Sequence, residues 1–167
     1  MARVYIGLGS NLHQPCWQVG QALSELGALP QTRQVARSKL YRSAPMGPPD
    51  QPDYINAVAA LDTELNPYDL LTNLQRVEQY HHRIRNRRWG ERTLDLDLLL
   101  YDDLELSTEE LIIPHPGAHE RAFVLYPLAE ITPSMIIPGR GRVTDLILCL
   151  PYSSIQPLKD DDIYYKC

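Results

Sequence analysis

Long apolar runs and regular glycine or proline repeats are missing from this 167-residue chain, and each absence excludes a class of protein. No apolar run approaches the ~20 residues that a membrane-spanning helix needs. The chain start has no long apolar segment before a small-residue cleavage site, so export is not expected. The 9 glycines and 14 prolines follow no period, which excludes collagen-like and low-complexity chains. We therefore expect a cytoplasmic globular protein without a membrane partner.

Cysteine is scarce as well. Cys16, Cys149 and Cys167 are widely spaced and form no C-x-x-C pair. This spacing favours reduced thiols without a disulfide framework or a zinc site.

Two nucleotide-binding motifs are also absent. Gly7–Gly9 lacks the third glycine of a dinucleotide fingerprint because Leu12 follows, and no P-loop is present.

Lysine is rare, with 3 residues against 13 arginines, and the formal charge is −5. The acidic balance argues against a general nucleic-acid binder. The arginines cluster, however, just before residue 95. Arginine offers forked donors to phosphate, so this cluster favours a polyphosphate site, with a solvated loop as the alternative. Trp89 lies in the middle of the cluster, where an exposed ring is typical of a lid or a stacking platform. The clustered residues are Arg76, Arg83, Arg85, Arg87, Arg88 and Arg92.

Hydrophobic periodicity predicts an alternating order of strands and helices. The order strand, helix, strand, strand, helix, strand is that of a ferredoxin-like α+β domain, an antiparallel sheet with both helices on one face. We further expect a helix over 120–130 that Pro127 interrupts, a helix over 143–150, and a tail over 151–167 of unknown role. Without a linker or repeat, 1–167 is expected to form a single domain. The expected strands are 3–9, 34–41, 54–65 and 93–101, and the expected helices are 17–26 and 66–80.

Two acidic residues on the last predicted strand carry the strongest chemical signal. Asp95 and Asp97 share one face of a strand and lie about 7 Å apart, whereas Leu94, Leu96, Leu98 and Leu100 are expected to point into a core. Two carboxylates of this kind suit Mg²⁺ when a substrate phosphate supplies further ligands. A strand whose exposed face happens to carry two acids is the alternative.

Other polar and aromatic residues are weaker candidates. Tyr54 and Asn56 share a strand face and suit a flat heterocycle, although an ordinary strand tyrosine and a surface asparagine are equally compatible. Asn11 is a turn former or a substrate contact. His115, between two prolines, is a phosphate contact, a proton-transfer group or a turn residue. We expect His81, His82, His13 and His119 to face solvent, since neighbours on a helix do not face together.

Separated motifs in the right order resemble the 6-hydroxymethyl-7,8-dihydropterin pyrophosphokinases of folate biosynthesis. They are RWGERTLDLDLL at 88–99, GSN at 9–11, APMGP at 44–48, QPDYINA at 51–57, PH at 114–115 and RAFVL at 121–125. The resemblance covers nearly the whole chain. It implies a ferredoxin-like fold and transfer of the pyrophosphoryl group of ATP to the pterin hydroxymethyl oxygen, with release of AMP. It also implies two Mg²⁺ ions, ATP and the pterin as small-molecule partners, and we expect a monomer.

The same resemblance implies a role for each matching residue. Asp95 and Asp97 would hold both metal ions, and Trp89 would tip a catalytic loop. Arg83 and Arg92 would join them in catalysis. The pterin would contact Ser43, Ala44, Pro45, Met46, Tyr54, Asn56, Trp89, Asp95, Phe123 and Asn11. ATP would contact Gln75, Glu78, Arg83, Arg85, Arg92, Leu98, His115 and Arg121.

Two other functions remain open on the residues alone. A ferredoxin-like nucleotidyltransferase or two-metal nuclease could use the same pair of aspartates. A non-catalytic small-molecule sensor would bind a ligand without consuming ATP. Formation of AMP from ATP, Mg²⁺ and the pterin separates the three.

Overall fold

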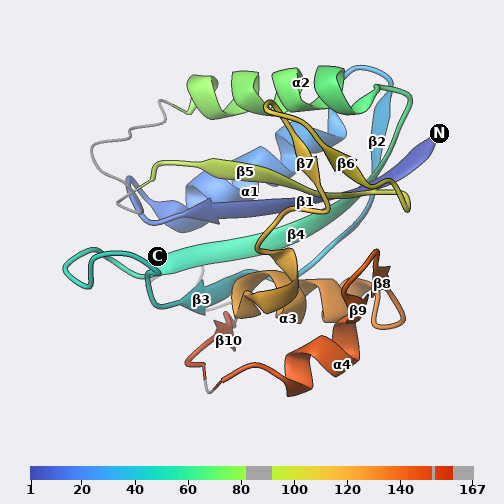
Figure 1. Cartoon of the computed structure of the whole chain (residues 1–167). Coiled ribbons are helices and arrows are strands. Elements are labelled where there is room, and N and C mark those ends of the chain that lie inside the picture. Colours follow the sequence, from blue (N-terminus) through green and yellow to red (C-terminus); the bar gives the residue numbers. More distant parts are fainter. Residues whose placement is uncertain (82–91, 152, 160–167) are drawn as a thin grey trace.

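The computed structural model describes residues 1–81, 92–151 and 153–159, and its centre is a six-stranded antiparallel sheet (Figure 1). Its strands are β1 (Ala2–Ser10), β2 (Thr32–Arg37), β3 (Tyr41–Ser43), β4 (Tyr54–Thr63), β5 (Asp95–Tyr101) and β10 (Gln156–Pro157). Their order is β10-β3-β4-β1-β5, and β2 pairs with β4 beyond β3. Without β10 this is the strand order of the ferredoxin-like α+β fold, which confirms the predicted class.

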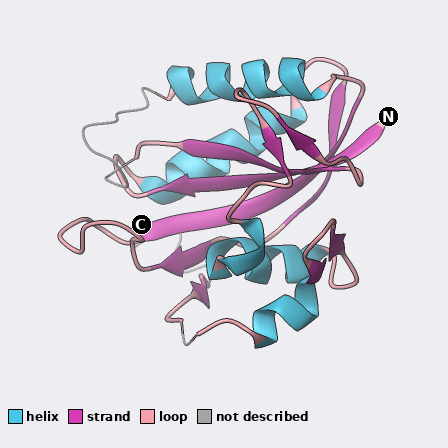
Figure 2. Cartoon of the chain, in the orientation of Figure 1, coloured by secondary structure: helices cyan, strands magenta, loops and turns pink. Residues whose placement is uncertain are grey.

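Helices cover both faces of the sheet (Figure 2). The longer elements are α1 (Pro15–Gly27), α2 (Pro67–Tyr80), α3 (Ala122–Ile131) and α4 (Val143–Leu148). The shorter ones are the 3₁₀ turn η1 (Ala118–Glu120) and the pairs β6 (Leu106–Ser107) with β7 (Ile112–Ile113) and β8 (Ile136–Ile137) with β9 (Gly141–Arg142). Helices α1 and α2 pack on one face, and α3 and α4 on the other. No helix in the described ranges is long and apolar enough to cross a membrane.

The first two helices form for local reasons. Helix α1 buries Val19, Leu23 and Leu26, which recur at helical spacing. Helix α2 begins at Asn66, whose Oδ1 accepts a hydrogen bond from the N–H of Asp69 at 2.9 Å. Proline follows the cap at the first helical position, where no N–H is needed. Both predicted helices are therefore confirmed.

Residues of β5 divide between the two cores. Leu96 and Leu98 pack with α1 and α2 as predicted. Leu100 was expected beside them, but it lies in the second core with Leu99 and Tyr5. The pairing of β1 with β5 shifts register between Tyr5 and Ile6, so one extra residue of β5 enters at this bulge. The bulge ends the strict alternation on which the prediction rested.

Three further expectations are wrong in detail. The strand predicted over 34–41 is divided into β2 and β3, and Ser38 between them bonds Val58 through both its N–H and its hydroxyl group. Helix α3 continues through Pro127, because burial of Leu125 and Leu128 compensates for the missing N–H. Cys16 is disulfide-bonded, whereas Cys149 is an exposed free thiol.

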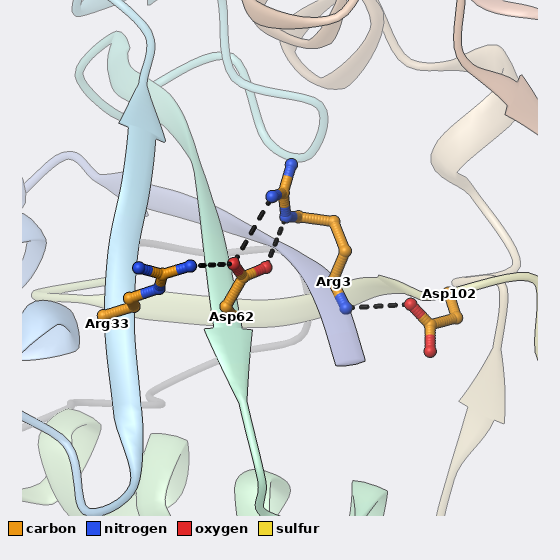
Figure 3. Close-up of polar contacts among 4 residues, drawn as sticks. All are labelled: Arg3, Arg33, Asp62 and Asp102. Carbon is orange, nitrogen blue, oxygen red and sulfur yellow. Dashed lines mark hydrogen bonds and ion pairs between the residues drawn. The ribbon is translucent and has the colours of Figure 1, made fainter. Parts of the chain in front are cut away.

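A group of opposite charges lies at the starting end of β1 (Figure 3). Asp62 accepts from Arg3 Nε at 2.5 Å and from Arg33 Nη2 at 3.1 Å. The backbone N–H of Arg3 also donates to Asp102 Oδ1 at 2.8 Å. The two guanidinium groups, Arg3 above all, hold the pKa of the Asp62 carboxyl below its usual value, although partial burial opposes them. We call these four residues the Asp62 cluster.

Candidate active site

A cavity of about 320 Å³ opens at the far end of the sheet from the Asp62 cluster, where β1, β3, β4, β5 and the start of α3 meet. Many of the residues predicted from sequence line it together. They are Ser43, Ala44, Met46, Tyr54, Asn56, Arg92, Asp95, Asp97, His115, Arg121 and Phe123. The cavity is also lined by Gly7, Leu8, Gly9, Ala57 and Val124, which the sequence analysis did not assign to a site.

The floor of the cavity is the bare backbone of β1. A Cβ atom added to Gly9 would lie 3.3 Å from Asn56 Oδ1 and 3.6 Å from Tyr54 Cδ1. A Cβ atom at Gly7 would lie 3.3 Å from a methyl group of Leu99. Two glycines at alternate positions of a central strand weaken the strand, and their presence often marks close approach of a ligand. This spacing was the sequence signal for the floor.

One half of the cavity is flat and has few charges. Tyr54 and Phe123 bring aromatic rings from β4 and α3, and Asn56 is buried between the strands. Asn56 Nδ2 donates to Ser43 Oγ at 2.7 Å, which fixes the orientation of the amide. Aromatic faces beside an oriented amide and hydroxyl group suit a planar heterocycle with polar edges.

The other half carries the two aspartates. In the pairing of β1 with β5, Asp95 lies opposite Gly9 and Asp97 lies opposite Gly7. Both carboxylates are half-buried and line the cavity, as the alternation predicted. Within the described ranges, no three His, Cys, Asp or Glu residues gather around a metal position. Two carboxylates fit Mg²⁺, which commonly completes its shell with water and substrate phosphates.

His115 faces Asp97 as a neutral ring. Its Nε2 lies 3.8 Å from Asp97 Oδ1, too far for a hydrogen bond. Its Nδ1 accepts from the N–H of Gly117 at 3.1 Å, so the proton of the neutral ring is on Nε2. Burial, aided by the Arg121 guanidinium, lowers the pKa of His115 to about 4, although the Asp95 charge opposes the shift. His115 therefore offers a neutral donor near the carboxylates.

Arg121 lies close to Gly117. A Cβ atom on Gly117 would lie 2.4 Å from Arg121 Nε, so the glycine leaves space that the guanidinium uses. The Cζ atom of Arg121 is also 5.8 Å from the centre of the Phe123 ring. The guanidinium thus borders both halves of the cavity, one aromatic and one acidic.

Comparison with known proteins identifies the family. Residues 5–133 match the family model described as 7,8-dihydro-6-hydroxymethylpterin-pyrophosphokinase (HPPK). The chain belongs to this family. A 2-amino-4-hydroxy-6-hydroxymethyldihydropteridine pyrophosphokinase from Haemophilus influenzae is 49% identical over 147 residues, 88% of this chain and 92% of that protein. A protein of the same name from Pseudomonas aeruginosa is 48% identical over 156 residues, 93% of this chain and 96% of that protein.

Solved structures agree with this HPPK fold. A Plasmodium falciparum HPPK-DHPS with pteroate superposes with a TM-score of 0.71 at 12% identity, over 89% of this chain and 42% of that chain. An HPPK-DHPS in complex with substrates gives a TM-score of 0.68 at 12% identity, over 89% of this chain. This chain spans 43% of the latter protein. At such identity the likeness supports the fold alone.

The HPPK chain places several predicted residues outside the cavity lining. Gln75 is exposed on α2, and Leu98 is buried in the core on the other face of β5. Glu78 is buried, and its Oε2 accepts from the N–H of Leu96 at 2.9 Å, between the two aspartates. Pro45 is not among the lining residues, although its neighbours are.

Asn11 holds the rim of the HPPK cavity together. Its Nδ2 donates to Gln51 Oε1 at 3.1 Å and to the Pro52 carbonyl at 2.9 Å. Its Oδ1 accepts from the N–H of Arg92 at 2.8 Å, and its own N–H donates to the Arg92 carbonyl at 3.0 Å. A direct substrate contact by this amide would require breaking some of these bonds.

The remaining predictions concern histidines and the arginine segment. Arg83, Arg85 and Trp89 lie outside the described residues. His13 is exposed as expected. The expectation for His81 is wrong, because its side chain is 3% exposed. Its side chain turns into the space between α1 and α2, which sequence spacing alone did not reveal.

Proposed function

We propose that this HPPK chain transfers the pyrophosphoryl group of ATP to the hydroxymethyl oxygen of 6-hydroxymethyl-7,8-dihydropterin and releases AMP, as a step of folate biosynthesis. One observation carries the assignment: a single cavity joins a flat aromatic half to a half with two carboxylates, a histidine and arginines. The first half suits a pterin ring and the second a metal-bound triphosphate. Membership in the family and the names of its curated relatives support the same reaction.

The flat half would bind the pterin. Its ring would lie between Tyr54 and Phe123, above the bare floor at Gly9. Asn56 and Ser43, already oriented by their mutual hydrogen bond, would read the polar edge of the ring. This arrangement would turn the hydroxymethyl group of the pterin toward the aspartates.

The charged half would bind the triphosphate. Asp95 and Asp97 would hold Mg²⁺, which neutralises phosphate charge and orients the phosphate oxygens when bound. His115 would donate its Nε2 proton to a phosphate oxygen as a neutral group. Arg92 and Arg121 would supply forked cationic donors. Positioning and charge stabilisation, with no assigned general base, account for catalysis in this proposal.

In the reaction, the hydroxymethyl oxygen attacks the β-phosphorus in line with the departing oxygen. A bond forms between that oxygen and Pβ, and the bond between Pβ and the α–β bridging oxygen breaks. The bridging oxygen leaves on AMP, and the hydroxyl proton is released. The products are AMP and the pterin diphosphate.

Several finer features belong to the same proposal. Two Mg²⁺ ions would act together, since two carboxylates at adjacent outward positions can share a pair of ions across the phosphates. The protein would act in the cytoplasm as a monomer. Residues 1–167 would form one domain, which is supported by two cores that share a single sheet.

The decisive experiment incubates the protein with ATP, Mg²⁺ and hydroxymethyldihydropterin and separates the nucleotides. We expect AMP and pterin diphosphate in equal amounts, with neither product when the pterin or the metal is omitted. Appearance of ADP in place of AMP, or ligand binding without ATP consumption, would contradict the proposal. Incubation with single-stranded and double-stranded DNA in place of the pterin tests for the nuclease alternative.

A further inference from the structure

A buried histidine outside the cavity connects α1 to the end of α2. His81 Nδ1 lies 2.5 Å from Gln18 Oε1, and His81 Nε2 lies 2.8 Å from Glu25 Oε2. Both partners belong to α1, and Gln18 is itself buried. The centre of the Trp17 ring lies 6.2 Å from the centre of the imidazole. His81 is therefore nearly enclosed, and each of its ring nitrogens has a polar partner on α1.

The partners present oxygen atoms to the ring. Gln18 Nε2 donates to the carbonyl of His13 at 3.0 Å, so its Oε1 is the atom that faces the ring and accepts. A Glu25 carboxylate can only accept. Each ring nitrogen of His81 therefore faces an oxygen atom of α1. The two contacts join the C-terminal end of α2 to two positions on α1.

His81 lies at the C-terminal end of α2. This helix packs on β5, the strand that carries Asp95 and Asp97. The N–H of His81 closes α2 by donating to the carbonyls of Val77 and Glu78, each at 3.1 Å. One turn earlier, the buried Glu78 carboxylate accepts from the N–H of Leu96. Leu96 lies between Asp95 and Asp97, so a displaced last turn of α2 would move the backbone that carries both carboxylates.

The same contact reaches the rim of the cavity through the β1–α1 turn. His13 and Gln14 in this turn have positive φ angles of 53° and 62°, which are unfavourable for residues other than glycine. Gln18 stabilises the turn by binding the His13 carbonyl, and its N–H donates to the Gln14 carbonyl at 3.0 Å. Asn11, at the start of the turn, binds Arg92.

We propose that His81, held between Gln18 and Glu25, is a positioning residue for the triphosphate half of the active site. It fixes the last turn of α2, and through Glu78 it fixes the backbone between Asp95 and Asp97. This inference rests on the proposed function, because it assigns a role in that reaction. His81 reaches the site through Glu78 and Leu96, the residue between the two aspartates, so its influence should be confined to the nucleotide and the chemical step.

The test compares His81→Phe, which keeps a ring without its nitrogens, with the milder Glu25→Gln. Gln21→Ala, an exposed substitution on α1, is the matched control. AMP formation is measured for kcat and for the KM of each substrate, alongside thermal unfolding. The ring nitrogens of His81 are observed separately by ¹⁵N NMR of the wild type, with His81→Phe used to assign the signals.

We expect kcat to fall about 10-fold in His81→Phe, with a pterin KM within about twofold of the wild type. Glu25→Gln should show a smaller loss in kcat with the fold intact. A ring N–H proton of His81 should exchange slowly with water, because the side chain is buried. The role is refuted if kcat in Glu25→Gln matches that in Gln21→Ala, or if pterin KM rises as much as kcat falls. Exchange of the ring N–H as fast as in an exposed histidine would refute the buried contact. If the wild type forms no AMP, the proposed function fails, and the NMR result still decides the contact.

Discussion

The two ends of β1 carry charge in opposite ways. At its start, Arg3 lies opposite Asp62, and one carboxylate binds two guanidinium groups at 2.5 and 3.1 Å. At its end, Gly7 and Gly9 lie opposite two carboxylates of the same sign on one face of β5. The first arrangement pairs a carboxylate with two guanidinium groups of the chain. The second places two carboxylates side by side on the wall of the cavity.

This difference separates stability from function along a single strand. Opposite charges at the Asp62 cluster favour the folded chain, although exposed guanidinium groups limit the benefit. At the other end, the two carboxylates are about 7 Å apart, and a cation bound near both would reduce their mutual repulsion. We therefore expect substitutions at one end to change unfolding and substitutions at the other to change turnover.

The largest effect is expected for Asp97→Asn. Loss of one metal ligand should lower the single-turnover rate of AMP formation at least about 100-fold, equivalent to about 3 kcal/mol. The substitution keeps the size and shape of the side chain, so the variant should remain folded. Rapid-quench kinetics and calorimetry measure both. A near-normal single-turnover rate would remove Asp97 from the metal site.

Tyr54→Leu tests the flat half of the cavity. Loss of the aromatic face should raise the pterin KM by about 10-fold, equivalent to about 1.4 kcal/mol, and leave the ATP KM unchanged. Steady-state kinetics with each substrate varied measures the two constants. Tyr126→Leu, at an exposed position of α3, is the control. An equal rise in both constants would show that the two halves are not separate.

Gly117→Ala tests whether Arg121 needs the space beside Gly117 to bind the nucleotide. The new methyl group would meet the guanidinium at 2.4 Å and displace it, so the ATP KM should rise about fivefold, equivalent to about 1 kcal/mol. Nucleotide titration by calorimetry checks the change. Gly20→Ala is the matched control, because nothing lies within 4 Å of its added Cβ atom. Equal affinities in the two variants would show that Arg121 does not need this space.

Asp62→Asn should have the smallest effect on activity, with kcat within about twofold of the wild type. The melting temperature should fall at neutral pH, because both guanidinium groups lose their charged partner. Since the pKa of Asp62 is lowered, its contribution is present above the usual carboxyl pKa and is lost as pH falls through the lowered value. Melting curves in acid should therefore converge for variant and wild type. A constant difference at all pH values would contradict this assignment.

Alternation along strands allowed much of the site to be predicted. Asp95 with Asp97, and Tyr54 with Asn56, line the cavity because residues two apart share a face. The order of elements likewise predicted the sheet. These inferences needed only the alternation of side chains along a strand. The alternation failed for Leu100, because the bulge opposite Tyr5 and Ile6 shifts the register of β5.

Other features depend on contacts between distant segments. Phe123 and His115 reach the cavity because the chain beyond β5 returns across the second face of the sheet. His81 is buried by Gln18 and Glu25, which are 63 and 56 residues away. No spacing within the helix indicated these partners. The spacing of Gly7 and Gly9 is a local signal for the floor, but the residues that their missing Cβ atoms would approach are on β4 and β5.

The bare stretch of β1 has a consequence for resistance to inhibitors. A planar compound lying over Gly9 would rest on main-chain atoms, which mutation cannot exchange. Any replacement of Gly9 would add a Cβ atom about 3.3 Å from Asn56 Oδ1 and would narrow the space that the natural ligand must share. A substitution at Gly9 that excluded such a compound should therefore also weaken binding of the natural ligand.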